Sequence, residues 1–106
     1  ALLGLGIKKD DEVIIPDLTF VSDANAVLAC NAKPIVTDIN KENFFLSISN
    51  VKKNITKKTK AIIPVHIYGN PCDFNSIRRM SEESKIPIIE DACQAHGAKY
   101  CQKYVF

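Results

Sequence analysis

Four short apolar runs recur along the chain, and they constrain its fold more than any other feature. They lie at Val13–Ile15, Pro34–Val36, Ala61–Val65 and Ile86–Ile89. Each run is continuous rather than alternating in polarity, which is typical of strands buried on both faces of a parallel sheet. The intervals between the runs are long enough for a helix and its turns, as right-handed βαβ crossovers require.

The intervals carry helical patterns. The first is a broad apolar segment at Phe20–Asn31. A short helix is expected after Ser47 and a longer one after Asp73, because both side chains cap helix N-termini well. The longer helix has apolar residues at every third position and is expected to end near Lys85. The order strand, helix, strand, helix, strand, helix, strand predicts the α/β class.

Two prolines complicate the third and fourth runs. Pro64 and Pro87 stand inside them, and proline has no N–H to donate to a strand ladder. We therefore expect both prolines at strand starts or at sheet edges.

Composition excludes several classes of protein. The chain has 106 residues, of which 46% are hydrophobic and 25% charged, so it is neither disordered, collagen-like nor a coiled coil. The longest N-terminal apolar run, Ala1–Ile7, is far short of the ~18 residues of a membrane span. The net charge is +2, and the lysines within Lys52–Lys60 lack interleaved aromatics. We therefore expect neither a membrane nor a nucleic-acid partner.

The cysteines and the chain ends indicate the setting. Cys30, Cys72, Cys93 and Cys101 form no C-x-x-C pair, so a reducing, cytoplasmic environment is expected. The chain begins on Ala1 rather than Met and stops on the apolar Tyr104–Phe106. We expect it to be an interior piece of a longer protein.

Ligands of open α/β sheets gather beyond the carboxyl ends of the strands. The segments at those ends are polar, aromatic or glycine-bearing, unlike the opposite ends. They are Pro16–Phe20, Thr37–Asp38, His66–Gly69 and Glu90–Gln94. Any site on this chain is expected there.

The residue chemistry at these ends leaves alternatives open. Glu90 and Asp91 are neighbours on one strand, so their side chains should point to opposite faces. Asp91 either caps the following turn or faces a ligand. Cys93 and His96 lack a second matched pair of metal ligands, so no metal site is expected.

Taken in order, the strand ends and their flanks carry a resemblance that no single motif carries. The matching segments are Asp11–Pro16, Leu18–Val21, Ala24–Ala26, Ala32–Pro34 with Asp38, Thr59–His66 with Tyr68–Gly69, Ile89–Ala92, and Gln94–Gly97. Together they resemble the DegT/StrS-type (DegT/DnrJ/StrS) sugar aminotransferases. The resemblance is collinear and covers nearly the whole chain.

The resemblance implies a fold type I enzyme that uses pyridoxal 5'-phosphate (PLP) and acts as a homodimer. Residues 1–106 would be part of its large, PLP-binding domain, truncated at both ends. Such enzymes move an amino group from glutamate to a nucleotide-linked keto-deoxysugar. A PLP-dependent sugar dehydratase of the same fold, or a non-catalytic βαβ binding or regulatory module, are the alternatives.

The resemblance also implies roles for single residues. Asp91 would pair with the pyridinium nitrogen of PLP, Gln94 would contact its ring hydroxyl, and Phe20 would lie against the ring face. His66 belongs to a family motif and is a candidate for lining the site. The lysine that forms the Schiff base would follow Phe106, so the fragment would hold no catalytic residue and would be inactive alone.

Two positions depart from the family pattern. Asp23 stands where a neutral residue is usual, and Cys93 replaces a small alanine. An acid at a helix start suits the helix dipole, but it disfavours an anionic ligand approaching that end.

Overall fold

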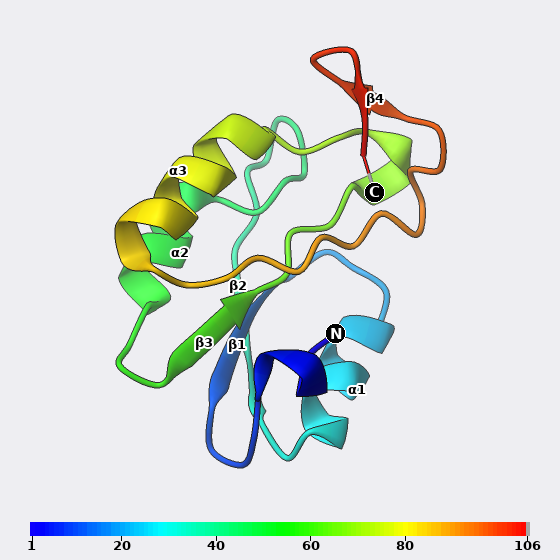
Figure 1. The fold of residues 1–106 in the computed structure, drawn as a ribbon. Coiled ribbons are helices and arrows are strands. Elements are labelled where there is room, and N and C mark those ends of the chain that lie inside the picture. The colour runs from blue at the N-terminus through cyan, green and yellow to red at the C-terminus, as the bar shows by residue number, and fades with distance from the viewer. Residues whose placement is uncertain (106) are drawn as a thin grey trace.

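The computed structural model describes residues 1–105, so the expected end of the piece at Phe106 lies outside the described residues. Strands and helices alternate along the chain (Figure 1). The elements are the strands β1 (Glu12–Pro16), β2 (Lys33–Thr37), β3 (Thr59–Ile62), β4 (Lys99–Tyr100) and β5 (Lys103–Tyr104), the helices α1 (Ser22–Ala29), α2 (Ile48–Asn54) and α3 (Phe74–Ser84), and the 3-10 turns Leu3–Leu5 and Ile67–Gly69.

A parallel sheet organises the chain. Its strand order is β2-β1-β3, with the first apolar run in the central strand. Ile14 pairs with Ile35 on one side and with Ile62 on the other. The predicted α/β class is confirmed, and so is the predicted order of strands and helices as far as α3. The two short strands β4 and β5 form a separate antiparallel hairpin.

The fourth apolar run lies beside β3 but is not a continuous strand, which corrects the prediction. It makes two isolated parallel bridges, Ile62 with Ile88 and Val65 with Asp91. The N–H of Asp91 donates to the carbonyl of Pro64 at 3.0 Å. Pro64 has no N–H and cannot donate a hydrogen bond to the fourth run. This missing hydrogen bond interrupts the ladder. Pro64 therefore lies just beyond the carboxyl end of β3, between the bridges of Ile62 and Val65, and not at a strand start or sheet edge as expected.

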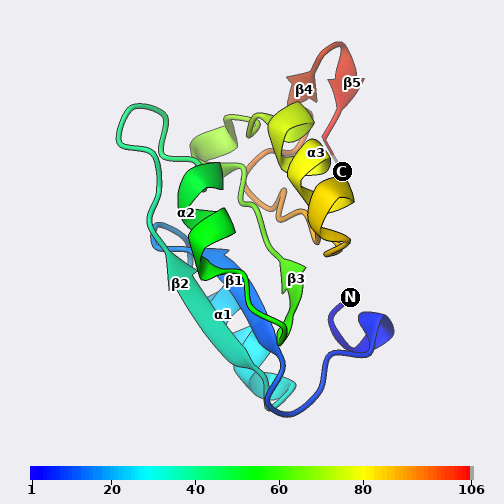
Figure 2. The ribbon, with the colours of Figure 1, turned by 90° about the vertical axis from the view of Figure 1, so that its left-hand side faces the viewer.

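Helices cover both faces of the sheet. Figures 1 and 2 show α1 on one face and α2 with α3 on the other. The alternation along β1 follows this layering: Val13 and Ile15 join the core under α1, whereas Ile14 joins the core under α2 and α3. Both cores are made of side chains that are almost completely buried.

The strand β2 is less buried than its apolar sequence predicted. It lies at the edge of the sheet in the described residues, and 55% of Val36 is exposed. The prediction of burial on both faces is therefore wrong for this strand and right for β1, where Val13, Ile14 and Ile15 are at most 2% exposed.

The helix ends match the expected positions with one difference in chemistry. The N–H of Ser76 donates to Asp73 Oδ1 at 3.4 Å, and Lys85 ends α3 in the left-handed conformation with φ 56°. Ser47 does precede α2, but its hydroxyl pairs with that of Ser49 at 3.1 Å instead of capping the helix. In the described chain, every helix is too short or too polar to cross a membrane.

Candidate functional site

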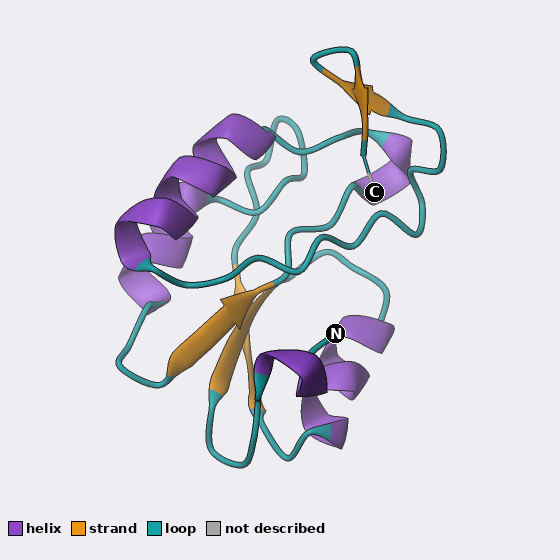
Figure 3. Cartoon of the chain, in the orientation of Figure 1, coloured by secondary structure: helices purple, strands orange, loops and turns teal. Residues whose placement is uncertain are grey.

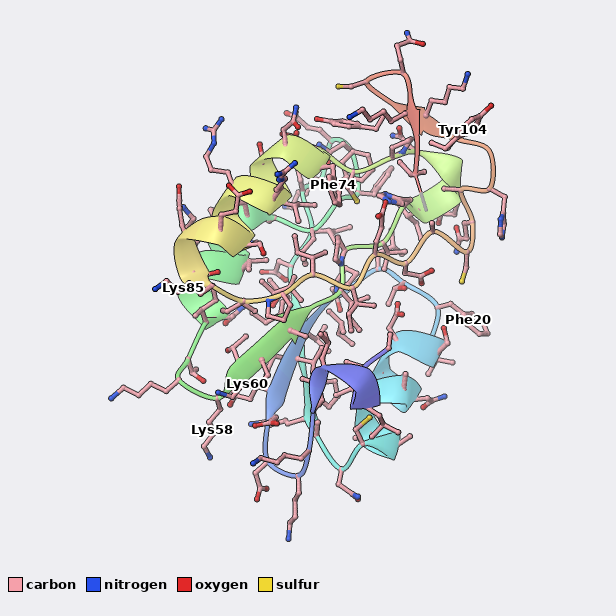
Figure 4. The ribbon with its side chains drawn as sticks, in the orientation of Figure 1. Phe20, Lys58, Lys60, Phe74, Lys85 and Tyr104 are labelled. Atoms are coloured by element: carbon pink, nitrogen blue, oxygen red, sulfur yellow. The ribbon has the colours of Figure 1, made fainter. Side chains whose placement is uncertain are left out.

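The loops at the carboxyl ends of β1 and β3 and the segment through Asp91 lie at one end of the molecule. Figure 3 shows these loops gathering beyond the arrowheads of the strands. The lysine cluster lies at the opposite end, where Lys58 and Lys60 flank the start of β3 (Figure 4). The polar strand ends predicted from the sequence are thus separated from the basic surface.

Asp91 is held by the sheet and by the turn that follows it. Its backbone bridges to Val65, and its carboxylate Oδ1 accepts a hydrogen bond from the N–H of Cys93 at 2.9 Å. The capping contact that the sequence allowed is therefore present. The same side chain lines a cavity together with Asp23.

The cavity has a volume of about 480 Å³. It opens between α1, the N-terminal turn and the strand ends, and its walls are mostly apolar. The lining includes Leu2, Ser22, Asp23, Ala26, Ile63, Ile89, Asp91 and Cys93. Carboxylates facing such a space are desolvated, and a proton or an organic cation placed there offsets that cost.

Asp23 is the site residue that the sequence did not assign. It is only 7% exposed, and the hydroxyl of Thr19 donates to its Oδ2 at 2.5 Å. Burial raises the pKa of Asp23, the Thr19 hydrogen bond opposes this, and the nearby carboxylate of Asp91 raises the pKa further. The signal in the sequence was that Asp23 departs from the neutral residue usual in the family and stands at a helix start.

Gln94 is oriented by the turn after β3. Its side-chain Oε1 accepts the N–H of Tyr68 at 2.8 Å, which leaves the amide NH₂ as a hydrogen-bond donor. Tyr68 and Gly69 both have left-handed backbone conformations, with φ of 55° and 80°. A Cβ on residue 69 would stand 3.2 Å from the carbonyl oxygen of Gln94, so glycine permits this close approach.

Phe20 stands at the entrance to α1. Its side chain is 68% exposed, and Figure 4 shows it pointing outward from the start of the helix. Its carbonyl oxygen accepts the N–H of Asp23 at 3.4 Å. Phe20 thus contacts Asp23 through its backbone, but its side chain is not among the residues that line the Asp23–Asp91 cavity.

His66 lies beneath the site and has no exposed surface. Its Nδ1 accepts the N–H of Cys72 at 2.9 Å, and its Nε2 is 2.5 Å from Glu90 Oε1. The Cys72 thiol donates to the carbonyl of Val65, and burial raises its pKa to about 12. The sequence named His66 as a candidate for lining the site, whereas the structure connects it to the site through Glu90.

The cysteines and acids do not assemble into a metal centre within residues 1–105. All four cysteines are free thiols. Asp91 and Cys93 do interact, because the Asp91 carboxylate raises the pKa of the exposed Cys93 thiol. The cavity therefore offers carboxylates to an organic ligand, whereas Gln94 and Phe20 lie near the strand ends but outside its lining.

Comparison with known proteins gives a consistent family. The model of the DegT/DnrJ/EryC1/StrS aminotransferase family matches residues 1–105. GDP-perosamine synthase of Escherichia coli O157:H7 is 45% identical over 105 residues, which is 99% of this chain and 29% of that protein. The chain thus spans less than a third of that relative.

Two solved structures extend the comparison. NtdA from Bacillus subtilis with bound cofactor PMP has a TM-score of 0.90 and 43% identity, covering 97% of this chain and 24% of that one. GDP-4-keto-6-deoxymannose-3-dehydratase with a trapped PLP-glutamate geminal diamine has a TM-score of 0.86 and 26% identity, covering 98% and 29%.

Proposed function

Because the chain belongs to the DegT/DnrJ/EryC1/StrS aminotransferase family, we propose that it is part of the large, PLP-binding domain of a sugar aminotransferase. The intact protein moves an amino group from glutamate to the keto group of a nucleotide-linked deoxysugar. The similarity to a GDP-perosamine synthase supports a nucleotide-linked substrate. We also propose that it works as a cytoplasmic homodimer, which the free thiols of the described chain suit.

The Asp23–Asp91 cavity is the observation that carries this proposal. Asp91 presents a carboxylate to an apolar space and is already near a second buried carboxylate. A protonated pyridine nitrogen is a cation that fits this requirement. When bound, PLP supplies an electron sink for the substrate carbon that loses a proton. Asp91 would keep the proton on the ring nitrogen, and the Cys93 N–H would hold the carboxylate in place.

Gln94 and Phe20 supply the remaining contacts to the ring. With Oε1 accepting from the N–H of Tyr68, the NH₂ of the Gln94 amide is the group available to donate to the ring hydroxyl oxygen. Phe20 is free to lie against the ring face, because most of its side chain is exposed. These two residues would orient the ring plane, and Asp91 would set its charge.

The test is a half-reaction of the intact protein loaded with PLP. Addition of glutamate should convert the PLP form to the PMP form in a single turnover, followed by absorbance. A keto-sugar nucleotide added afterwards should return the PLP form and yield an amino sugar. If PLP is not retained, the non-catalytic βαβ module becomes the better description.

A sugar dehydratase is the second candidate, because the chain also matches a GDP-4-keto-6-deoxymannose-3-dehydratase over 98% of its length. The two activities differ in the product formed from the same class of substrate. Mass spectrometry of the sugar nucleotide separates them: the aminotransferase adds nitrogen, and the dehydratase removes water. The identity of the Schiff-base residue in the intact protein, lysine or histidine, gives the same answer.

A further inference from the structure

We propose that His66 is a positioning residue that sets the direction of the Asp91 carboxylate through Glu90. The proposal rests on the proposed function in assigning Asp91 to the cofactor. His66 cannot contact a ligand, because it is completely buried. Its influence has to pass through the groups that it binds.

The hydrogen bonds of His66 define its tautomer. Nδ1 accepts the Cys72 N–H and therefore carries no proton. The proton is on Nε2, which donates to Glu90 Oε1. The ring is thus a neutral donor to a carboxylate that is only 25% exposed. Both ring nitrogens are used, so the imidazole is fixed on two sides.

This side-chain bond stands next to the gap in the strand ladder. The N–H of His66 donates to the carbonyl of Asp91, and the N–H of Asp91 donates to the carbonyl of Pro64, each at 3.0 Å. Pro64 cannot donate toward the neighbouring segment. The His66–Glu90 bond supplies a tie between the two segments where the backbone cannot.

Because side chains alternate along an extended segment, the bond between His66 and Glu90 also affects the direction of the Asp91 side chain. Glu90 and Asp91 are consecutive on an extended segment, so they point to opposite faces. With the Glu90 side chain held against His66, the next residue, Asp91, faces the cavity that Asp23 lines, and Glu90 borders the same cavity. If Glu90 is released, Asp91 keeps its two backbone hydrogen bonds, with Pro64 and with His66, and the Cys93 N–H on its Oδ1. It loses the side-chain tie beside the gap at Pro64, and the segment there becomes freer to move.

Two substitutions of His66 separate its two hydrogen bonds. His66→Gln retains a donor near the Nε2 position and loses the acceptor for the Cys72 N–H. His66→Asn retains that acceptor and loses the donor to Glu90. In the intact protein, His66→Asn should speed amide hydrogen exchange at Asp91 and raise the Kd for PLP, each by about tenfold. His66→Gln should leave both close to the parent values.

A second pair of variants leaves the buried ring in place. Glu90→Gln keeps an acceptor for Nε2–H, and Glu90→Met removes it at similar length. Glu90→Met should repeat the effects of His66→Asn, and Glu90→Gln should not. This pair decides the matter if a substitution of His66 prevents folding.

The exchange measurement also separates positioning from general destabilisation. Exchange at Ile15, in the central strand, should change little in His66→Asn or Glu90→Met, whereas exchange at Asp91 should change strongly. Equal acceleration at both amides, or unchanged exchange at Asp91, overturns the proposal. If the parent protein retains no PLP, the proposed function fails, and the exchange comparison in the cofactor-free protein still decides the role of His66.

Discussion

A single carboxylate serves two purposes at Asp91. One oxygen accepts the Cys93 N–H, which fixes the turn after the strand end. The side chain also borders the cavity shared with Asp23. The sequence predicted Asp91 at the end of the fourth apolar run, and the structure places it beside Val65, just beyond β3. The approach of Asp23 could not be predicted, because it depends on how α1 packs against a segment nearly seventy residues later.

Asp91→Asn separates these two purposes. Asparagine caps a turn about as well as aspartate, so we expect a melting temperature close to that of the parent. Asparagine removes the charge that keeps the ring nitrogen protonated. The single-turnover rate with glutamate should fall by orders of magnitude, on the order of a hundredfold or more for loss of a directed charge. Equal rates in mutant and parent would leave Asp91 as a cap alone.

Asp23→Asn should stabilise the cofactor-free protein at neutral pH. The native pKa of Asp23 is raised above its ordinary value of 3.8, chiefly by burial. The folded state therefore binds the proton more tightly than the unfolded state, and stability falls as pH rises through the native pKa. Asparagine cannot ionise, and its carbonyl oxygen still accepts from the Thr19 hydroxyl. Its advantage in melting temperature should be present at pH 7 and absent below about pH 3.8.

At the scale of elements, the features that depend on neighbouring residues were predicted better than those that depend on strand pairing. The cap at Asp73 and the end of α3 at Lys85 follow from neighbouring residues and were predicted correctly. Pairing partners decide the rest. The fourth run contains the expected apolar residues, yet Pro64 in the adjacent segment breaks its ladder. Val36 is exposed because β2 has a neighbouring strand on one side only in the described sheet. The composition of β2 does not encode this position.

The cap of α3 makes a pH-dependent contribution to stability. Hydrogen bonds from Ser76 and then Tyr100 lower the pKa of Asp73. A lowered acid pKa stabilises the fold above the ordinary value and loses this effect as pH falls through the native pKa. Asp73→Ala should cost about 1 kcal/mol at pH 7, and Asp73→Asn should cost less because it still caps.

Urea unfolding of the three proteins at pH 7 and at pH 3 measures this contribution. The difference between parent and Asp73→Ala should shrink at the lower pH. A difference independent of pH would assign the effect to helix propensity rather than to the charged cap.

At the scale of the whole molecule, the described chain leaves apolar surface open on several elements. Leu3, Leu28 and Val36 are each more than half exposed, and the chain spans 29% of the length of its Escherichia coli relative. In solution the 106-residue chain should self-associate, because such surface is normally covered. Sedimentation velocity measures this, and a monodisperse monomer would contradict it.

The same chain should show no transaminase turnover with glutamate and a keto-sugar nucleotide. Lys58 and Lys60 lie at the amino end of β3, whereas Asp91 bridges to Val65 beyond the carboxyl end of that strand. A cofactor held at the strand ends would therefore lack a covalent anchor from this cluster. Formation of the 2-oxo acid of glutamate, or of an amino sugar, faster than with free PLP alone would contradict this expectation.

The position of β1 between β2 and β3 affects the order in which the sheet folds during translation. Pairing β1 with β2 closes a shorter loop than pairing β1 with β3, because β2 follows immediately after α1. Loop closure costs more entropy as the loop lengthens, by about 0.6 kcal/mol for each doubling. As the chain leaves the ribosome, the β1–α1–β2 unit is complete before β3 exists. One edge of the central strand β1 therefore stays unpaired until β3 has been synthesised. The cavity beside Asp91 can form only after the last of these segments has left the ribosome.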